Sequence, residues 1–114
     1  MKAFISIRSG IFFLISVVLL TGVFACQLNH PPKRLIVEIK DMKFQPSKLI
    51  VQKGDTVIWI NKDIVAHNVT EKNNAWASPL LPPDSTWKRV VEKSGSYYCS
   101  IHINMVGELI VESR

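Results

Sequence analysis

The sequence is poor in cysteine and histidine, and its basic residues do not form a run. Of its 114 residues, two are Cys and three are His. Two Cys are too few for the disulfide framework that stabilises many small exported domains. The 14 Lys and Arg are scattered along the chain, which is typical of a solvated surface, so we expect no nucleic-acid partner. A chain this short has room for about one domain.

The longest apolar run lies at the N-terminus. Lys2 and Arg8 precede it with no acidic residue between them, and residues 10–25 are then almost entirely apolar. This order of a positive segment and an apolar segment is the pattern of a secretory signal peptide. A membrane-spanning helix needs about 20 apolar residues, and Ser16 and Thr21 interrupt this run. We therefore predict a signal peptide over residues 1–25 rather than a retained anchor.

Cys26 follows Val23-Phe24-Ala25, an order that resembles the lipobox of bacterial lipoproteins. Phe24 is bulkier than the usual residue at its position, so two interpretations stay open: acylation of Cys26, or ordinary cleavage after Ala25. Both imply export to the bacterial periplasm, with membrane contact only through an N-terminal lipid anchor. Residues 26–33 are then a short linker, and residues 34–114 are the folded domain.

The remaining sequence predicts an all-β fold. Leu35, Val37 and Ile39 alternate with Ile36, Glu38 and Lys40, and a period of two is the signature of a half-buried strand. Residues 72–83 contain three prolines, which predicts a long loop. About seven strands in one small domain indicate a Greek-key β-sandwich. The expected strands are residues 35–40, 49–51, 57–60, 65–70, 86–91, 96–100 and 106–112.

Three metal-ligand side chains fall close together near the C-terminus. Cys99, His102 and Met105 are spaced three residues apart, between two expected strands. A thiolate and a thioether favour Cu(I), an imidazole accepts both copper oxidation states, and two His, one Cys and a weak axial Met form the blue-copper arrangement. His67, in the expected strand 65–70, can supply the second imidazole. Each residue alone has an ordinary structural interpretation, but together they predict one copper ion that cycles between Cu(I) and Cu(II).

The motifs around these residues resemble the cupredoxin family, in particular its plastocyanin, pseudoazurin and amicyanin group. The resemblance implies a type 1 copper site with His67, Cys99, His102 and Met105 as ligands. The ligand loop, with two residues between His102 and Met105, is most similar to that of amicyanin. The matching segments are residues 42–46, 50–61, 67–69, 98–102 and 105–107.

The resemblance also implies a role for a residue that does not touch the metal. In the family, the residue after the first His ties its strand to the Cys loop, and here that residue is Asn68. Such contacts fix the orientation of metal ligands. Two positions depart from the family: Ile101 stands where plastocyanin and amicyanin usually have Pro, and Ile103 stands where amicyanin has another Pro. Because of these departures, the resemblance does not predict the stiffness of the ligand loop or the reduction potential of the site.

Together these features predict an exported blue-copper electron carrier, not an enzyme, that works as a monomer. We expect redox proteins to dock transiently near His102. The apolar residues around it can form a docking patch or belong to the core: Leu80, Leu81, Pro82, Ile101 and Ile103. The alternative is a copper carrier or storage protein, but such proteins use Met and His clusters, and Met42 and Met105 are the only Met beyond the initiator.

Overall fold

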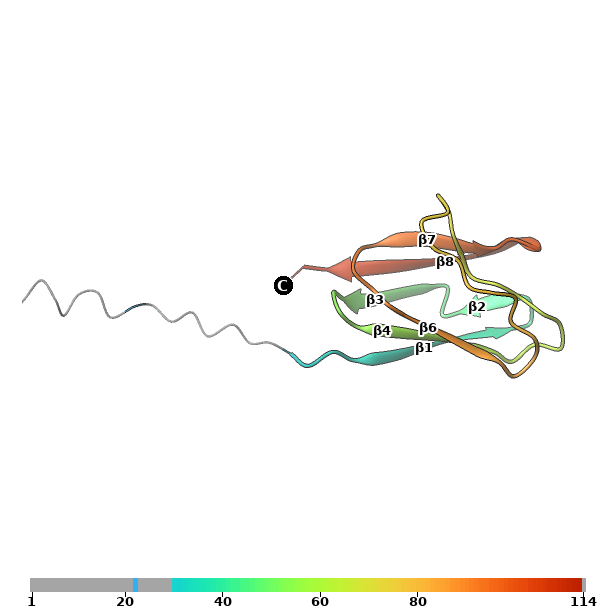
Figure 1. Cartoon of the computed structure of the whole chain (residues 1–114), viewed down its shortest axis with the longest axis horizontal. Helices are drawn as coiled ribbons and strands as arrows, with labels where there is room; N and C mark the ends of the chain where they lie inside the picture. The colour runs from blue at the N-terminus through green and yellow to red at the C-terminus, as the bar shows by residue number, and fades with distance from the viewer. Residues whose placement is uncertain (1–21, 23–29, 114) are drawn as a thin grey trace, which may run out of the picture. The chain divides into compact units, whose positions relative to one another are not determined.

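The computed structural model describes residue 22 and residues 30–113, which include two β-sheets packed face to face (Figure 1). All elements in these residues are strands, so the predicted all-β class is confirmed. Within the described part of the chain, no helix has the length and apolar character that crossing a membrane requires. The strands are β1 (Arg34–Lys40), β2 (Lys43–Gln45), β3 (Lys48–Gln52), β4 (Thr56–Asn61), β5 (Thr70–Glu71), β6 (Thr86–Val90), β7 (Gly95–Cys99) and β8 (His102–Glu112).

Each sheet combines parallel and antiparallel pairs. One sheet has the order β2-β1-β4-β6, and the other has the order β3-β8-β7-β5. The β1–β4 and β3–β8 pairs are parallel, and the remaining pairs are antiparallel. The β7–β8 register shifts between Tyr98 and Cys99, and Cys99 then pairs with His102. Two candidate ligands are therefore held opposite each other by a strand pair.

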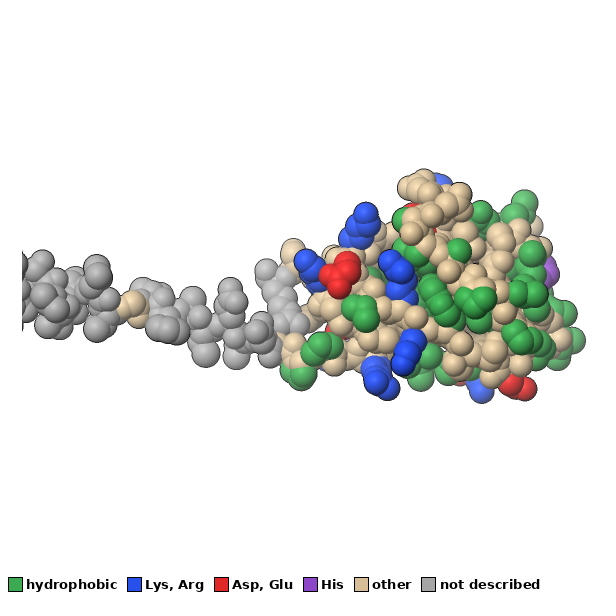
Figure 2. Space-filling view, in the orientation of Figure 1, with side chains coloured by type: hydrophobic (Ala, Val, Ile, Leu, Met, Phe, Trp, Pro, Cys, Tyr) green, Lys and Arg blue, Asp and Glu red, His purple; other side chains and the backbone are tan. Residues whose placement is uncertain are grey.

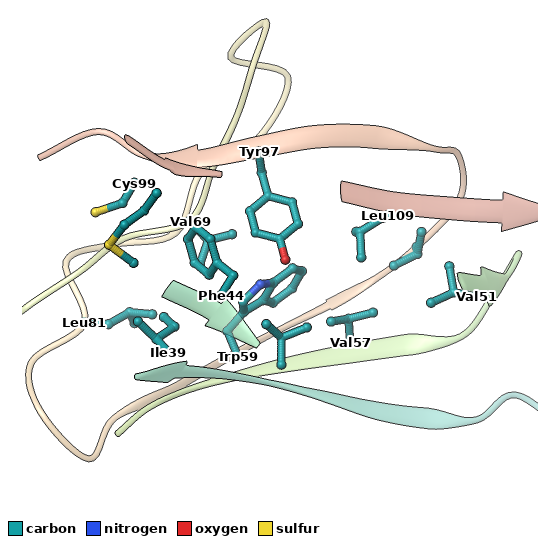
Figure 3. Close-up of a cluster of buried hydrophobic side chains, with 13 residues drawn as sticks. Ile39, Phe44, Val51, Val57, Trp59, Val69, Leu81, Tyr97, Cys99 and Leu109 are labelled. Carbon is teal, nitrogen blue, oxygen red and sulfur yellow. The ribbon is translucent and has the colours of Figure 1, made fainter. Parts of the chain in front are cut away.

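The core lies between the sheets and follows the alternation of the strands. In β4, Val57, Trp59 and Asn61 are buried, whereas the residues between them are half-buried. Aromatic rings join the two sheets, since Tyr97 lies 5.5 Å from Trp59 and 4.8 Å from Phe44 between ring centroids. Figure 3 shows this core running from Val51 at one end to Cys99 at the other. The site therefore forms one end of the hydrophobic core.

The strand predicted over residues 65–70 is wrong. Only an isolated bridge between His67 and Leu81 and the first residue of β5 fall in it. The Nδ2 amide of Asn61 donates to the carbonyl oxygens of Val65 and Leu81, both at 2.9 Å. A buried side chain thus satisfies carbonyl groups that a neighbouring strand would otherwise pair.

Other element boundaries also differ from the prediction. The described residues form eight strands, where about seven were expected. Two short strands were not predicted: β5, and β2, which pairs with β1 across a turn at Asp41 and Met42. Strand β8 begins at His102, four residues before the predicted start at Val106. The loop predicted over residues 72–83 is confirmed, since it contains only isolated bridges, at Ala77 and Leu81.

Candidate metal centre

Three candidate ligand atoms meet at one end of the sandwich. The Nδ1 atoms of His67 and His102 are 3.1 Å apart, and the Sγ atom of Cys99 lies 3.8 Å from the first and 3.7 Å from the second. The point equidistant from these atoms lies about 2.1 Å from each, close to metal–nitrogen and metal–sulfur distances in protein sites. A single metal ion therefore fits between the three side chains.

The three side chains come from two separate parts of the chain. Cys99 is the last residue of β7 and His102 is the first residue of β8. His67 lies in the segment after β4 and is held by two backbone hydrogen bonds to Leu81, at 3.1 and 2.7 Å. His67 and Cys99 are fully buried, and His102 is half-buried. The site is therefore closed to solvent except along His102.

Met105 lies beside this group. It follows His102 by three residues along β8, is buried, and belongs to the same core cluster as Cys99. Met105 and His102 also line one surface pocket, together with Met42, Ile101, Ile103 and Asn104. The structure therefore brings the four predicted ligands, His67, Cys99, His102 and Met105, to one end of the fold.

Asn68 links the two segments that carry the ligands. Its backbone N–H donates to the Sγ atom of Cys99 at 3.4 Å. Its side chain donates to the Oγ atom of Ser100 at 2.6 Å and accepts from the Ser100 N–H at 2.8 Å. The structure therefore places Asn68 between the segment of His67 and the loop of Cys99. An N–H donor to sulfur also stabilises negative charge on that atom.

Asp63 belongs to the site as well, although the sequence analysis missed it. Its Oδ2 atom lies 2.9 Å from Nε2 of His67. The hydrogen bond with His67, followed by one from the Met42 backbone, lowers the pKa of this carboxyl below its ordinary value of 3.8. The available signal was a carboxylate four residues before a candidate ligand.

Apolar side chains are exposed at the same end. Figure 2 shows hydrophobic side chains gathered around a histidine at the right-hand end of the view. Leu80, Ile101 and Ile103 are exposed, as is Pro82, whereas Leu81 is 3 % exposed and belongs to the core. Of the two interpretations left open for these residues, the core one therefore holds for Leu81. We call the exposed large aliphatic residues of this end the ligand-end patch: Ile64, Val65, Leu80, Ile101 and Ile103.

Comparisons with known proteins agree with this geometry. Residues 33–80 match a family described as copper binding proteins of the plastocyanin/azurin family. Amicyanin of Paracoccus denitrificans is 31% identical over 85 residues, which cover 68% of this chain and 65% of that protein. Amicyanin-alpha of Methylorubrum extorquens is 30% identical over 83 residues, which cover 67% of this chain and 70% of that protein.

Solved structures give a similar result. A purple cupredoxin from Nitrosopumilus maritimus superposes with a TM-score of 0.64 at 28% identity, covering 68% of this chain and 99% of that chain. A Cu(I) structure of an amicyanin variant superposes with a TM-score of 0.65 at 28% identity, covering 69% of this chain and 82% of that chain.

Proposed function

Because this chain belongs to the plastocyanin/azurin family of copper-binding cupredoxins, we propose that it is an exported blue-copper electron carrier and not an enzyme. The observation that carries the proposal is the triangle formed by Nδ1 of His67, Nδ1 of His102 and Sγ of Cys99. Two imidazoles and one thiolate at these distances suit a single copper ion, with Met105 as the weak axial thioether.

Copper bound at this site supplies a centre that takes up one electron as Cu(II) and releases it as Cu(I). The protein's part is to keep the ligands in one arrangement for both oxidation states. Cys99 and His102 are fixed by their strand pairing, and His67 by its bonds to Leu81. Because the interior around buried side chains is closely packed, these ligands move little when the charge of the ion changes. Little movement means a low barrier to electron transfer.

The route for the electron in this proposal is the exposed edge of His102. His67 and Cys99 are fully buried, so His102 is the imidazole ligand within reach of a partner. The ligand-end patch surrounds this end of the molecule with apolar side chains. An apolar patch of modest size suits brief docking with a redox protein through a small interface. We propose that the protein acts as a monomer that exchanges such partners in turn.

The alternative function is copper transport or storage. A carrier must exchange its metal, which requires accessible ligands, whereas His67, Cys99 and Met105 are buried here. A copper enzyme is less compatible still, because the described residues contain a single group of His, Cys and acidic side chains close enough to hold a metal. Burial of three of the four ligands therefore favours electron transfer.

Export is proposed from the N-terminal sequence. Lys2, Arg8 and the apolar run over residues 10–25 have the order of a signal peptide. Apart from residue 22, this segment and Cys26 lie outside the described residues. Cleavage after Ala25, or acylation of Cys26, would deliver the domain to the bacterial periplasm.

The decisive experiment is copper titration of the purified mature protein. We expect one equivalent of Cu(II) to produce an intense blue colour that disappears on reduction and returns on reoxidation. The reduced protein should keep its copper over many cycles in the presence of a Cu(I) chelator. A colourless Cu(II) complex would contradict a type 1 site. Rapid loss of copper to the chelator would instead support the carrier alternative.

A further inference from the structure

His67 is held from both sides of its ring. One ring nitrogen, Nδ1, faces Cys99 and His102 at 3.8 and 3.1 Å. The other, Nε2, lies 2.9 Å from Oδ2 of Asp63. The His67 side chain is fully buried, and that of Asp63 is 13% exposed. This contact therefore lies in a largely dry environment, where a hydrogen bond to a charged group is strong.

The two contacts fix where the ring proton resides. A metal ligand atom must offer its lone pair, so Nδ1 of His67 carries no proton in the loaded site. The proton then lies on Nε2, which donates to the carboxylate of Asp63. A carboxylate that accepts from the outer nitrogen of a ligating imidazole fixes its tautomer and orientation, and it makes the imidazole a more basic donor.

Asp63 is itself held by its surroundings. Its Oδ2 atom also accepts the N–H of Met42 at 3.0 Å, and its Oδ1 atom accepts the N–H of Ile64 at 3.1 Å. Its backbone N–H donates to Oδ1 of Asn61 at 2.9 Å. Asp41 and Met42 adopt left-handed backbone conformations, with φ of 52° and 59°, which non-glycine residues seldom do. The β1–β2 turn is thus joined to His67 through a single carboxylate.

We propose that Asp63 is a positioning residue that acts through His67 to strengthen Cu(II) binding and to lower the reduction potential of the site. It aims Nδ1 at the metal and increases the electron donation of the imidazole, and a stronger donor stabilises the more highly charged ion. This inference rests on the copper site proposed above. Asp63 is then a residue that influences copper affinity and reduction potential without binding the metal, in addition to the four ligands and Asn68.

The test compares two carboxylate-to-amide changes in the full mature protein. Asp63→Asn removes the charge that faces His67. Asp84→Asn is the matched control, because Asp84 is exposed and its carboxylate makes no hydrogen bond within the described residues. Its backbone N–H donates to the carbonyl of Asn61, which places it near the same end. Its φ of 67° is a conformation that Asn also tolerates. The control therefore measures the effect of losing one negative charge without losing the bond to His67.

We expect Asp63→Asn to lower the Cu(II) affinity about 10- to 100-fold, measured by competition with a chelator, and to lower the Cu(I) affinity less. Each tenfold difference between the two losses raises the reduction potential by about 59 mV. Asp84→Asn should change both quantities much less. Equal affinities and potentials in the two variants would overturn the inference while leaving a blue wild type, and hence the proposed function, intact. A wild type that takes up no copper would overturn both.

A measurement on the unmodified protein keeps the inference testable if Asp63→Asn does not fold. Nitrogen-15 NMR of the Cu(I)-loaded wild type should show the His67 ring protonated at Nε2, with that proton exchanging slowly with water. An unprotonated Nε2, or a proton that exchanges as fast as that of a solvent-exposed imidazole, would overturn the inference.

Discussion

Asn68 and Ser100, which are 32 residues apart in the sequence, are joined by two hydrogen bonds. The Asn68 side chain donates to Oγ of Ser100 at 2.6 Å and accepts from the Ser100 backbone N–H at 2.8 Å. Ser100 directly follows Cys99. The loop that carries Cys99 and His102 is therefore fastened to the segment that carries His67 by one amide side chain.

We expect Asn68→Ala to loosen this connection. The backbone bond from Asn68 to Cys99 remains in the variant. The loss is that of three side-chain bonds, two with Ser100 and one from the Thr70 hydroxyl, worth about 1.5–4.5 kcal/mol of unfolding free energy in total. Copper should also leave the reduced variant faster. Asn104→Ala is the control, because Asn104 is an exposed residue of β8 at the same end of the fold. Denaturant unfolding and chelator-driven copper release test the prediction, and equal values in the two variants would contradict it.

Cys99→Ser should abolish the blue colour. The intense absorption of a type 1 site comes from a copper–thiolate bond, and serine offers only a hydroxyl in nearly the same volume. The fold should persist, because the buried position loses little packing. Absorption and electron paramagnetic resonance of the Cu(II) protein measure the effect. A variant that stays blue would exclude Cys99 as the thiolate ligand.

The sequence predicts those strands whose side chains alternate and are buried on one face. Val37 and Ile39 are both fully buried in β1, as their alternation predicts. The apolar residues around His67 are misleading, because Val65 is exposed and residues 65–70 pair only at His67 and at Thr70, the first residue of β5. Strand β2 is three residues long, which is too short to give a periodic signal. Alternation of apolar side chains along the sequence therefore predicts the long strands. The conformation of the segment that carries His67 depends instead on hydrogen bonds that form only in the folded protein.

Spacing along the chain identified the ligand loop, because Cys99, His102 and Met105 come from one short stretch. The residues that hold the ligands in place through hydrogen bonds include some outside this stretch, and the spacing of the ligands does not indicate them. The bond between Asp63 and His67 spans a segment whose backbone Asn61 contacts at Asp63 and Val65. The sequence left Leu81 open between a surface patch and the core, and its pairing with His67 is a contact that only the folded chain reveals.

Met105→Gln should keep copper bound and lower the reduction potential. An amide oxygen is a harder ligand than a thioether, so it favours Cu(II) over Cu(I). A tenfold shift in the relative affinity for the two ions corresponds to about 59 mV. Met42→Gln is the matched control, since Met42 lines the same pocket but is 42% exposed. Voltammetry measures both potentials, and an unchanged or higher value for Met105→Gln would count against Met105 as the axial ligand.

Tyr97 should make the copper-free protein lose stability in alkali. Burial raises the pKa of Tyr97 from 10.0 to about 12, although the nearby Trp59 indole opposes part of the shift. Above pH 10 the unfolded chain releases this proton while the folded chain retains it, so the folded state binds more protons and stability falls as the pH rises. The loss between about pH 10 and 12 amounts to about 2–3 kcal/mol.

Tyr97→Phe isolates this contribution. The Tyr97 hydroxyl has no hydrogen-bond partner among the described residues, and Figure 3 shows it directed toward Trp59 inside the core. Removing it should therefore change the stability little at neutral pH and make the alkaline decline shallower. Denaturant unfolding across this pH range measures the difference between the two proteins. Parallel stability curves would show that Tyr97 does not titrate differently in the two states.

Cys26→Ser should leave copper binding unchanged and alter maturation. Cys26 lies outside the described residues, and the sequence places it before the folded domain, next to a predicted cleavage site. In the lipoprotein interpretation, the wild type carries acyl chains on Cys26 and partitions with the membrane, whereas the variant does neither. A disulfide between Cys26 and Cys99 would instead leave no thiolate for copper, so the variant would gain a blue colour that the wild type lacks.

Mass measurement of the mature N-terminus, together with membrane fractionation, separates these outcomes. An unmodified chain that begins at Cys26 or Gln27 and is recovered wholly in the soluble envelope fraction would exclude acylation and favour ordinary cleavage. The copper site would be unaffected by that result, because Cys99 is a free, buried thiol within the folded domain. The same fractions, titrated with Cu(II), should be equally blue for Cys26→Ser and the wild type, since the metal depends on Cys99 and not on Cys26.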